Sequence, residues 1–284
     1  MLSYMVSGLK MKKFKQVYIE ITNACNLNCP FCPNSTLEKK EMSLENIELI
    51  LSDVKNYTDT VCLHIQGEPL LHSHFMDVVS LCDKYGLMIN LTTNGVLVNK
   101  LIEVFKKYNC FKMINISLQA MVNFGANRDV YIENINYFLS YKNKFFREIP
   151  VNLRLWNDKS VDTNKEINDY AWKVFSHIVE HHHIYNTRIS ENDEFDWPTL
   201  DMPDNPVMSG CLGGKSQLGI LVDGRVVLCC LDYLGHSNLG NIFECSLEEI
   251  IHSDKYLRSI NGFCDRKPYL EICKKCTYRN RFSK

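Results

Sequence analysis

The stretch Cys25-Asn-Leu-Asn-Cys29-Pro-Phe-Cys32 places three cysteines within eight residues, directly after the apolar, β-branched run 16–22. Three thiolates can bind three irons of a [4Fe-4S] cluster, which normally takes four cysteines, so one iron keeps an open position where chemistry can occur. The alternatives are a zinc site, which usually pairs two CxxC motifs, and cysteines buried as small apolar residues, as we expect for Cys62 and Cys82. The three-cysteine spacing favours the cluster.

The composition predicts a soluble globular protein. The 284 residues are 45% hydrophobic and 23% charged, and the net charge of −1 gives no electrostatic reason to expect nucleic acid as a partner. We find no apolar run of about 18 residues and no signal peptide, so we expect a cytoplasmic protein with no membrane partner. Thirteen cysteines in such a protein indicate metal or redox chemistry before disulfides.

Segments that predict strands alternate with segments that predict helices. The predicted strands are 16–22, 60–65, 87–91, 112–117, 150–155 and 184–190, and the predicted helices are 43–57, 75–85, 98–108, 131–144 and 164–181. This alternation predicts a parallel sheet with right-handed crossovers. We therefore expect an α/β fold, a partial (β/α)6 TIM-like barrel, with a long loop around Gly125 after the fourth strand.

Polar motifs follow four of these strands, at the ends where a β/α barrel builds its site. They are Gly67-Glu68-Pro69, Thr92-Thr93-Asn94-Gly95, Ser117 with Gln119, and Arg154. Each has an ordinary alternative, because Gly-Glu-Pro is a turn, Asn-Gly is common in hairpins, and buried polar groups need structural hydrogen bonds anyway. A helix rather than a strand follows Asn94-Gly95, which disfavours the hairpin.

The order of these motifs resembles the radical SAM enzymes, over residues 16 to 281. In that family the free iron chelates S-adenosylmethionine (SAM), and an electron from the reduced cluster releases a 5′-deoxyadenosyl radical. Gly67-Glu68-Pro69 resembles the family's GGEP motif, with Gln66 in place of the first glycine, and Thr93-Asn94-Gly95 resembles its TNG motif.

The resemblance implies a set of cofactor-binding residues. Glu68 and nearby carbonyls would receive the SAM ammonium group, and Thr93 and Asn94 its carboxylate or ribose. Ser117 and Gln119 would bind the ribose, and Arg154 would pair with the carboxylate. The full set is Phe31, Gly67, Glu68, Pro69, Thr93, Asn94, Ser117, Gln119 and Arg154, with Cys25, Cys29 and Cys32 as cluster ligands.

The last part of the chain contains a second group of cysteines. An acidic segment with three prolines, 191–207, predicts a linker across the barrel mouth, where Trp197 either covers the substrate or fixes the loop. Beyond it, Cys211 precedes a predicted hairpin of strands 218–222 and 226–228 joined by Asp223-Gly224. Cys229 and Cys230 end the hairpin, and Cys273-Lys-Lys-Cys276 follows near the C-terminus.

This order resembles the SPASM extension of radical SAM enzymes in its shortened form, called twitch. The resemblance implies a small α+β domain in which Cys211, Cys229, Cys273 and Cys276 hold a second [4Fe-4S] cluster, with Cys230 pointing away. A structural zinc ion would use the same four thiolates, and that alternative stays open. Cys245 and Cys264 match no pattern.

Two further groups of charged or ionisable residues are open to two interpretations. Seven basic side chains lie in the last 21 residues, and they either raise the potential of an anionic cluster or form a solvated tail. They are Arg266, Lys267, Lys274, Lys275, Arg279, Arg281 and Lys284. His177 and the run His181-His182-His183 suggest a metal site, but we expect helix-end or solvent contacts instead.

Together these features predict a radical SAM oxidoreductase that oxidises a peptide or protein, with the auxiliary cluster as electron acceptor. The alternatives are dehydrogenation of a small alcohol or amino sugar, and a non-catalytic iron–sulfur or zinc scaffold. A flavodoxin- or ferredoxin-type donor would supply the first electron. Few residues precede the first strand, which we take as unfavourable to leader-dependent peptide binding. The expected divisions are an extension (1–15), the barrel (16–190), the linker (191–207) and the auxiliary domain (208–284).

Overall fold

The computed structural model describes residues 13–33, 37–158 and 161–283. Within them the core is an eight-stranded sheet of order β6-β5-β4-β3-β2-β1-β7-β8, in which β1 to β6 pair in parallel. The strands are β1 (Gln16–Ile19), β2 (Thr60–Cys62), β3 (Met88–Thr93), β4 (Phe111–Ser117), β5 (Val151–Asn157), β6 (Thr187–Asp193), β7 (Gln217–Ile220) and β8 (Val226–Val227). The chain order of β1 to β6 confirms the predicted partial barrel.

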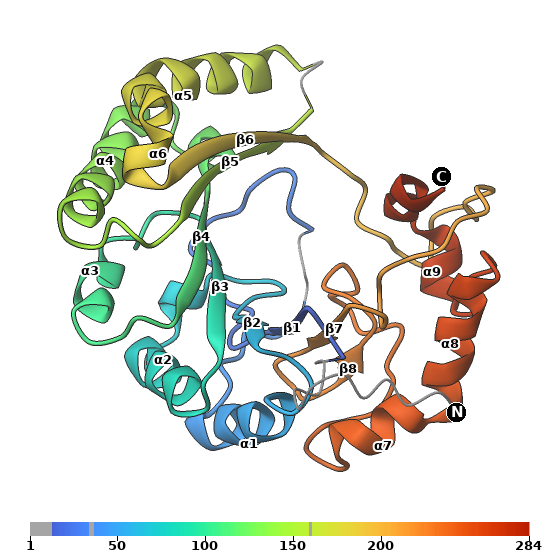
Figure 1. Cartoon of the computed structure of the whole chain (residues 1–284). Helices are drawn as coiled ribbons and strands as arrows, with labels where there is room; N and C mark the ends of the chain where they lie inside the picture. The colour runs from blue at the N-terminus through green and yellow to red at the C-terminus, as the bar shows by residue number, and fades with distance from the viewer. Residues whose placement is uncertain (1–12, 34–36, 159–160, 284) are drawn as a thin grey trace.

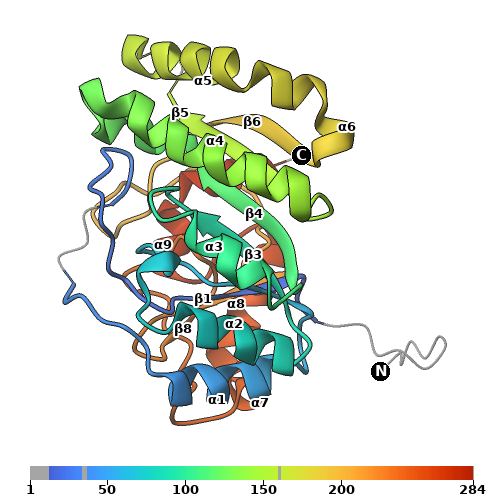
Figure 2. The same ribbon diagram turned by 90° about the vertical axis from the view of Figure 1, so that its left-hand side faces the viewer.

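Helices connect the strands and cover the outer face of the sheet. The α-helices are α1 (Leu44–Val54), α2 (Phe75–Lys84), α3 (Lys100–Phe105), α4 (Arg128–Phe145), α5 (Asp162–Glu180), α6 (His182–Tyr185), α7 (Leu247–His252), α8 (Asp254–Cys264) and α9 (Glu271–Lys275). Short 3-10 helices are η1 (Pro69–Leu71), η2 (Leu118–Asn123), η3 (Gly125–Asn127) and η4 (Thr277–Phe282). Figure 1 shows β1 to β6 as an arc with α1 to α5 outside it, and α7 to α9 on its open side. The turned view shows the same layer of helices over the strands (Figure 2).

Helix α1 illustrates how the sequence sets these elements. The side chain of Ser43, the N-cap, accepts a hydrogen bond from the amide of Asn46, as predicted for this position. The buried residues of the helix are Ile47, Ile50, Leu51 and Val54. Their three- and four-residue spacing forms one apolar face, which packs toward the sheet.

The structure corrects two details of the predicted barrel. The segment expected as a long loop around Gly125 contains the 3-10 helices η2 and η3, which lead directly into α4. Strand β6 is shifted along the chain from the predicted strand 184–190. It begins at Thr187, because residues 184 and 185 belong to α6, and it extends to Asp193, so the first three residues of the predicted linker pair with β5. Most of the predicted extension, residues 1–12, lies outside the described residues.

The sheet continues from the barrel into the C-terminal part of the chain. Strand β7 pairs in parallel with β1, and β8 pairs antiparallel with β7. The buried Glu20 carboxylate reinforces the junction by accepting from the amides of Gln66 (3.0 Å) and Val222 (3.1 Å), while burial raises its pKa. The two halves therefore share one backbone hydrogen-bond network.

Helices α7 and α8 then cover the hairpin side of the sheet. Ser246 and Glu249 form a capping box at the start of α7, and Ser253 caps α8. Within the described residues, none of the helices combines the length and apolar character needed to cross a lipid bilayer.

Candidate cluster and cofactor site

A cavity of about 410 Å³ lies at the carboxyl ends of the barrel strands. Its walls include predicted site residues from both halves of the chain: Cys25, Cys29, Phe31, Cys32, Gly67, Glu68, Thr93, Asn94, Ser117, Gln119, Arg154, Cys211, Cys229 and Cys276. Two predicted residues lie elsewhere. Pro69 is buried at the start of η1, and Cys273 lines a second, smaller cavity. The fold thus collects in one place residues that are up to 251 positions apart in sequence.

The loop that contains Cys25, Cys29 and Cys32 is closed by hydrogen bonds between the segments 21–23 and 40–42, which stand at its two ends. The amide of Met42 donates to the carbonyl of Ile21 (2.8 Å), and the amide of Asn23 donates to the carbonyl of Lys40 (3.2 Å). The side-chain oxygen of Asn23 accepts from the amide of Lys40 at 2.7 Å. These contacts hold both ends of the loop against each other, directly after strand β1.

Two asparagine side chains donate to cysteine sulfurs in this loop. Asn123 Nδ2 lies 3.1 Å from Cys29 Sγ, and Asn94 Nδ2 lies 3.7 Å from Cys25 Sγ. Hydrogen bonds to sulfur are one of the means by which proteins raise cluster potentials. Sequence reasoning did not identify Asn123, because it lies in η2, in a segment expected to be an irregular loop.

Gly67 brings the end of β2 into contact with the start of the cysteine loop. Its φ is +77°, and an added Cβ would lie 2.4 Å from the Thr22 carbonyl oxygen and 2.8 Å from that of Ala24. The adjacent amide of Glu68 donates to the Ala24 carbonyl at 2.8 Å. Glycine is required here because only a residue without a side chain permits this approach.

The Glu68 carboxylate joins the ends of β2 and β3. It is 1% exposed and accepts from Leu70 N (3.1 Å), Thr93 Oγ1 (2.8 Å) and Asn94 N (2.6 Å). Burial raises the pKa of Glu68 to about 7, although its three donors oppose that shift. About four acceptor positions exist on a carboxylate, so one is left for a cationic ligand.

Further around the cavity, polar atoms lack partners within the described part of the chain. They are Oε1 of Gln119, after β4, and Nδ1 of His64, after β2, both buried. Burial lowers the pKa of His64 to about 3, helped by the positive charge of Arg154, so His64 is neutral at physiological pH. Unpartnered buried atoms on a cavity wall are positions where a bound ligand can form hydrogen bonds.

Arg154 extends from β5 into the cavity. Its guanidinium lies 5.5 Å from the ring centroid of Trp156. Desolvation lowers the pKa of Arg154, while the nearby Tyr18, Tyr278 and Cys230 side chains raise it. Arg154 therefore faces the side of the cavity that the C-terminal part of the chain closes.

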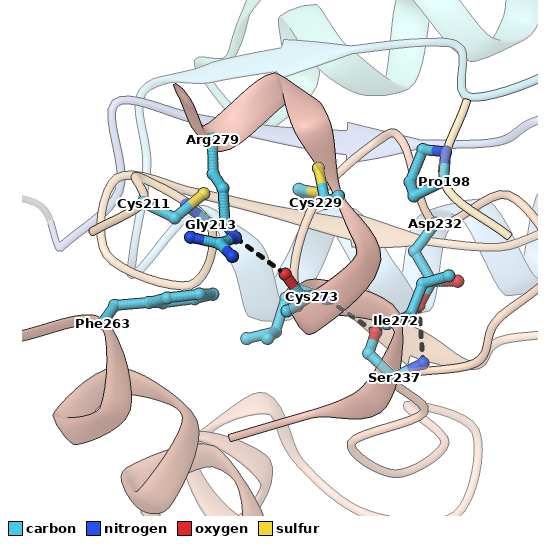
Figure 3. Close-up of a pocket in the computed structure, with 12 residues that line it drawn as sticks. Pro198, Cys211, Gly213, Cys229, Asp232, Ser237, Phe263, Ile272, Cys273 and Arg279 are labelled. Carbon is cyan, nitrogen blue, oxygen red and sulfur yellow. Dashed lines mark hydrogen bonds between the residues drawn. The ribbon is translucent and has the colours of Figure 1, made fainter. Parts of the chain in front are cut away.

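The four predicted auxiliary cysteines surround a second cavity of about 30 Å³. Cys211, Cys229, Cys273 and Cys276 all line it. Figure 3 labels the first three of these cysteines together with Gly213 and Arg279, which also line it. Cys230 lines the larger cavity and is not among the residues that line the smaller one. Burial raises the pKa of each of the four thiols, so metal binding here would have to displace their protons.

The residues present fit iron–sulfur clusters at both positions. Each thiolate of a cluster binds its own iron, and both groups of cysteines face cavities and lie near amide donors, such as Gly213 N at 3.3 Å from Cys211 Sγ. Over the described ranges, the His, Cys, Asp and Glu side chains form no group of three that could hold a single metal ion.

Aromatic side chains line the large cavity together with cysteines of both groups. Trp197, from the predicted linker, donates from Nε1 to the carbonyl of Phe31 at 3.0 Å and packs edge-on against Tyr233. Phe195 contacts Trp156, Trp197 and Tyr278, with ring centroids 4.5, 5.4 and 5.0 Å apart. Trp197 thus fixes the cysteine loop and also lines the cavity.

Two family models match the chain. The model of the radical SAM superfamily matches residues 19–151, which contain the cysteine loop and the strand-end motifs through Gln119. The chain belongs to the radical SAM superfamily. The model of SPASM, an iron–sulfur cluster-binding domain, matches residues 211–277, so this radical SAM chain has a C-terminal SPASM domain. SAM and iron–sulfur clusters are the cofactors that these domains imply.

Curated relatives match parts of this radical SAM chain. The tungsten-containing aldehyde ferredoxin oxidoreductase cofactor-modifying protein of Pyrococcus furiosus is 34% identical over 87 residues, which are 29% of this chain and 24% of the relative. The GTP 3′,8-cyclase of Clostridium botulinum is 25% identical over 165 residues, 53% of this chain and 51% of the relative. The chain thus spans about a quarter to about half of these relatives.

Solved structures show the same fold over nearly all of the chain. BtrN in complex with AdoMet and 2-DOIA is similar with a TM-score of 0.60 and 18% identity, covering 94% of each chain. Streptococcus suis SuiB bound to precursor peptide SuiA gives a TM-score of 0.62 and 18% identity, covering 94% of this chain and 73% of SuiB. These similarities confirm the partial barrel followed by a SPASM-like region.

Proposed function

We propose that this chain oxidises a peptide or protein substrate by two electrons, using SAM, the N-terminal cluster and an auxiliary [4Fe-4S] cluster. When bound, SAM and the reduced N-terminal cluster supply a 5′-deoxyadenosyl radical, which takes a hydrogen atom from a C–H bond. The substrate then releases one proton to solvent and one electron to the auxiliary site. A flavodoxin- or ferredoxin-type protein would supply the electron that starts the reaction.

The barrel residues would hold and orient SAM. Cys25, Cys29 and Cys32 would bind the N-terminal cluster, while Asn94 and Asn123 donate hydrogen bonds to two of its thiolates. The free acceptor position on Glu68 and the neighbouring carbonyls would receive the SAM ammonium group.

Farther from the cysteine loop, Gln119 Oε1 is suited to accept a hydrogen bond from a ribose hydroxyl, because it is buried and unpartnered among the described residues. Arg154 would pair with a carboxylate. The aromatic side chains around the cavity would exclude water from the radical.

One observation supports the oxidative reaction most directly. Cys211, Cys229 and Cys276 line the small auxiliary cavity and also the large cavity that contains the N-terminal cysteines. A cluster held by these residues would therefore face the space where the substrate loses its hydrogen. Four cysteine ligands leave no iron open, so electron transfer suits this cluster better than substrate binding.

A small alcohol or amino sugar is the second candidate substrate. The cavity of about 410 Å³ would have to hold SAM and the N-terminal cluster as well as the substrate, so the space left for the substrate is small. Trp156, Phe195 and Trp197 line it, which suits a compact substrate placed beside SAM.

The test measures iron, sulfide and zinc in the wild type and in a variant with Cys25, Cys29 and Cys32 all changed to Ala, after anaerobic reconstitution. We expect the triple variant to keep about four irons and to lose SAM cleavage to 5′-deoxyadenosine. Cys273→Ala should keep SAM cleavage but form no oxidised product. Zinc or no metal in the triple variant, or full turnover by Cys273→Ala, would refute the electron-acceptor role.

A further inference from the structure

Arg279, in η4, places a buried guanidinium beside the auxiliary cysteines. The residue is 3% exposed. Its Nε donates to the carbonyl of Cys273 (3.1 Å), and its two terminal nitrogens donate to Ser209 Oγ (2.9 Å) and the carbonyl of Asn205 (2.7 Å). The carbonyls of Val207 and Lys274 accept further hydrogen bonds. Every one of these acceptors is electrically neutral.

The Arg279 guanidinium has no carboxylate partner among the ion pairs of the described residues. Asp232 lines the same cavity, but its carboxylate accepts from the amides of His236 and Ser237 and from the Ser237 hydroxyl. In Figure 3 the guanidinium lies beside Cys211 and Cys273, and Asp232 lies farther across the pocket. A buried charge without a counter-ion is strongly unfavourable.

The ionisable groups that do face Arg279 are thiols. Cys211, Cys273 and Cys276 line the small cavity, and so does Arg279 itself. The Arg279 Nε donates to the backbone carbonyl of Cys273 at 3.1 Å. An anionic group bound to these cysteines would therefore supply the negative charge that the guanidinium lacks.

The other described basic residues near the C-terminus differ from Arg279. Lys274 pairs with Glu271 and Lys275 with Asp204. Arg266, Lys267 and Arg281 are exposed. The six basic residues that the structure describes here therefore do not form one group, and burial distinguishes Arg279 from the other five, while Lys284 lies outside the described residues.

We propose that Arg279 is the buried counter-ion of the auxiliary cluster and raises its reduction potential. The inference rests on the proposed function, because it requires an iron–sulfur cluster on Cys211, Cys229, Cys273 and Cys276. Reduction adds one negative charge to a cluster that is already anionic, and a nearby fixed positive charge favours that form. Arg279 thereby makes the cluster a better acceptor for the substrate's electron.

The test uses the triple variant without the N-terminal cluster, so that only the auxiliary cluster contributes to the signal. A redox titration, monitored by electron paramagnetic resonance, compares three proteins in this background: the one that keeps Arg279, the Arg279→Gln variant and the Arg279→Lys variant. At a fixed applied potential we expect Arg279→Gln to lower the ratio of reduced to oxidised cluster at least about tenfold, which is about 59 mV for one electron. Arg279→Lys keeps the charge and should restore most of the ratio.

Arg258→Gln is the matched control. Arg258 is also an arginine of the C-terminal domain, but it lies on the surface of α8 and pairs with Asp254. Its loss should leave the potential unchanged. A second measurement compares melting temperatures with and without iron, because a counter-ion role predicts that cluster binding stabilises wild type more than Arg279→Gln.

The outcomes separate this inference from the proposed function. Zinc or no metal in the triple variant would overturn both. An iron-loaded Arg279→Gln protein with the wild-type potential would overturn only the role of Arg279. If Arg279→Gln does not bind iron, Arg279→Lys decides. Iron binding with a potential close to that of the wild type supports the role of the charge, whereas loss of iron, or a potential at least about 59 mV below that of the wild type, overturns it.

Discussion

Replacing Gly67 with alanine tests whether close backbone contact between β2 and the cysteine loop determines the stability of the site. A non-glycine residue at its φ of +77° costs about 1–2 kcal/mol. The new Cβ would also lie 2.4 Å from one backbone carbonyl oxygen and 2.8 Å from another, and neither can rotate away as a side chain would. Overpacking of this kind adds about 1–3 kcal/mol. We therefore expect Gly67→Ala to lower the free energy of unfolding by about 2–5 kcal/mol.

Gly86→Ala is the matched control. Gly86 follows α2 with a φ of +67°, but an added Cβ would meet nothing within 4 Å. It should therefore cost only the conformational part, about 1–2 kcal/mol. Urea unfolding of both variants without metal measures the difference. Equal destabilisation of the two proteins would show that the contact with Thr22 and Ala24 is unimportant, and our account of Gly67 would be wrong.

Two further predictions concern the polar groups of the site. Burial raises the pKa of Glu68 from 4.5 in the unfolded chain to about 7, so its contribution to stability is full below pH 4.5 and is lost as the pH rises through 7. Between pH 4.5 and 7.5 the free energy of unfolding should therefore fall less in Glu68→Gln than in the wild type, by up to about 3 kcal/mol. Urea unfolding at several pH values measures this, and an equal fall in the two proteins would contradict the prediction. Asn123→Ala removes the hydrogen bond to Cys29 Sγ and should lower the potential of the N-terminal cluster, since donors to sulfur raise it. A redox titration of that cluster checks this, and a potential equal to wild type would exclude the contact as a determinant.

Local patterns explain why much of this protein could be predicted from its sequence. The spacing of Cys25, Cys29 and Cys32, and the order of the polar motifs at strand ends, lie within short segments. Since parallel strands bring their carboxyl ends together, residues as far apart as Glu68 and Gln119 could be assigned to one cavity before the structure was known. The alternation of strands and helices likewise predicted the barrel.

Features that depend on contacts between distant segments could not be predicted in this way. Asn123 reaches Cys29 only because η2 turns back toward the loop, and no pattern around it indicates this. Arg279 is one of several basic residues near the C-terminus, and only packing against Ser209 and Cys273 distinguishes it. The pairing of β7 with β1 joins residues about 200 positions apart, with no signal in either strand.

That pairing also determines what would happen to the barrel alone. Strand β1 has two neighbours, β2 and β7, and its residues Val17 and Ile19 are fully buried. Without the C-terminal domain, β1 would become an edge strand, with its backbone groups free to pair with another molecule. A fragment ending at residue 207 would therefore be prone to aggregate through intermolecular β-pairing. The C-terminal domain protects the barrel from self-association, independently of any metal that it binds.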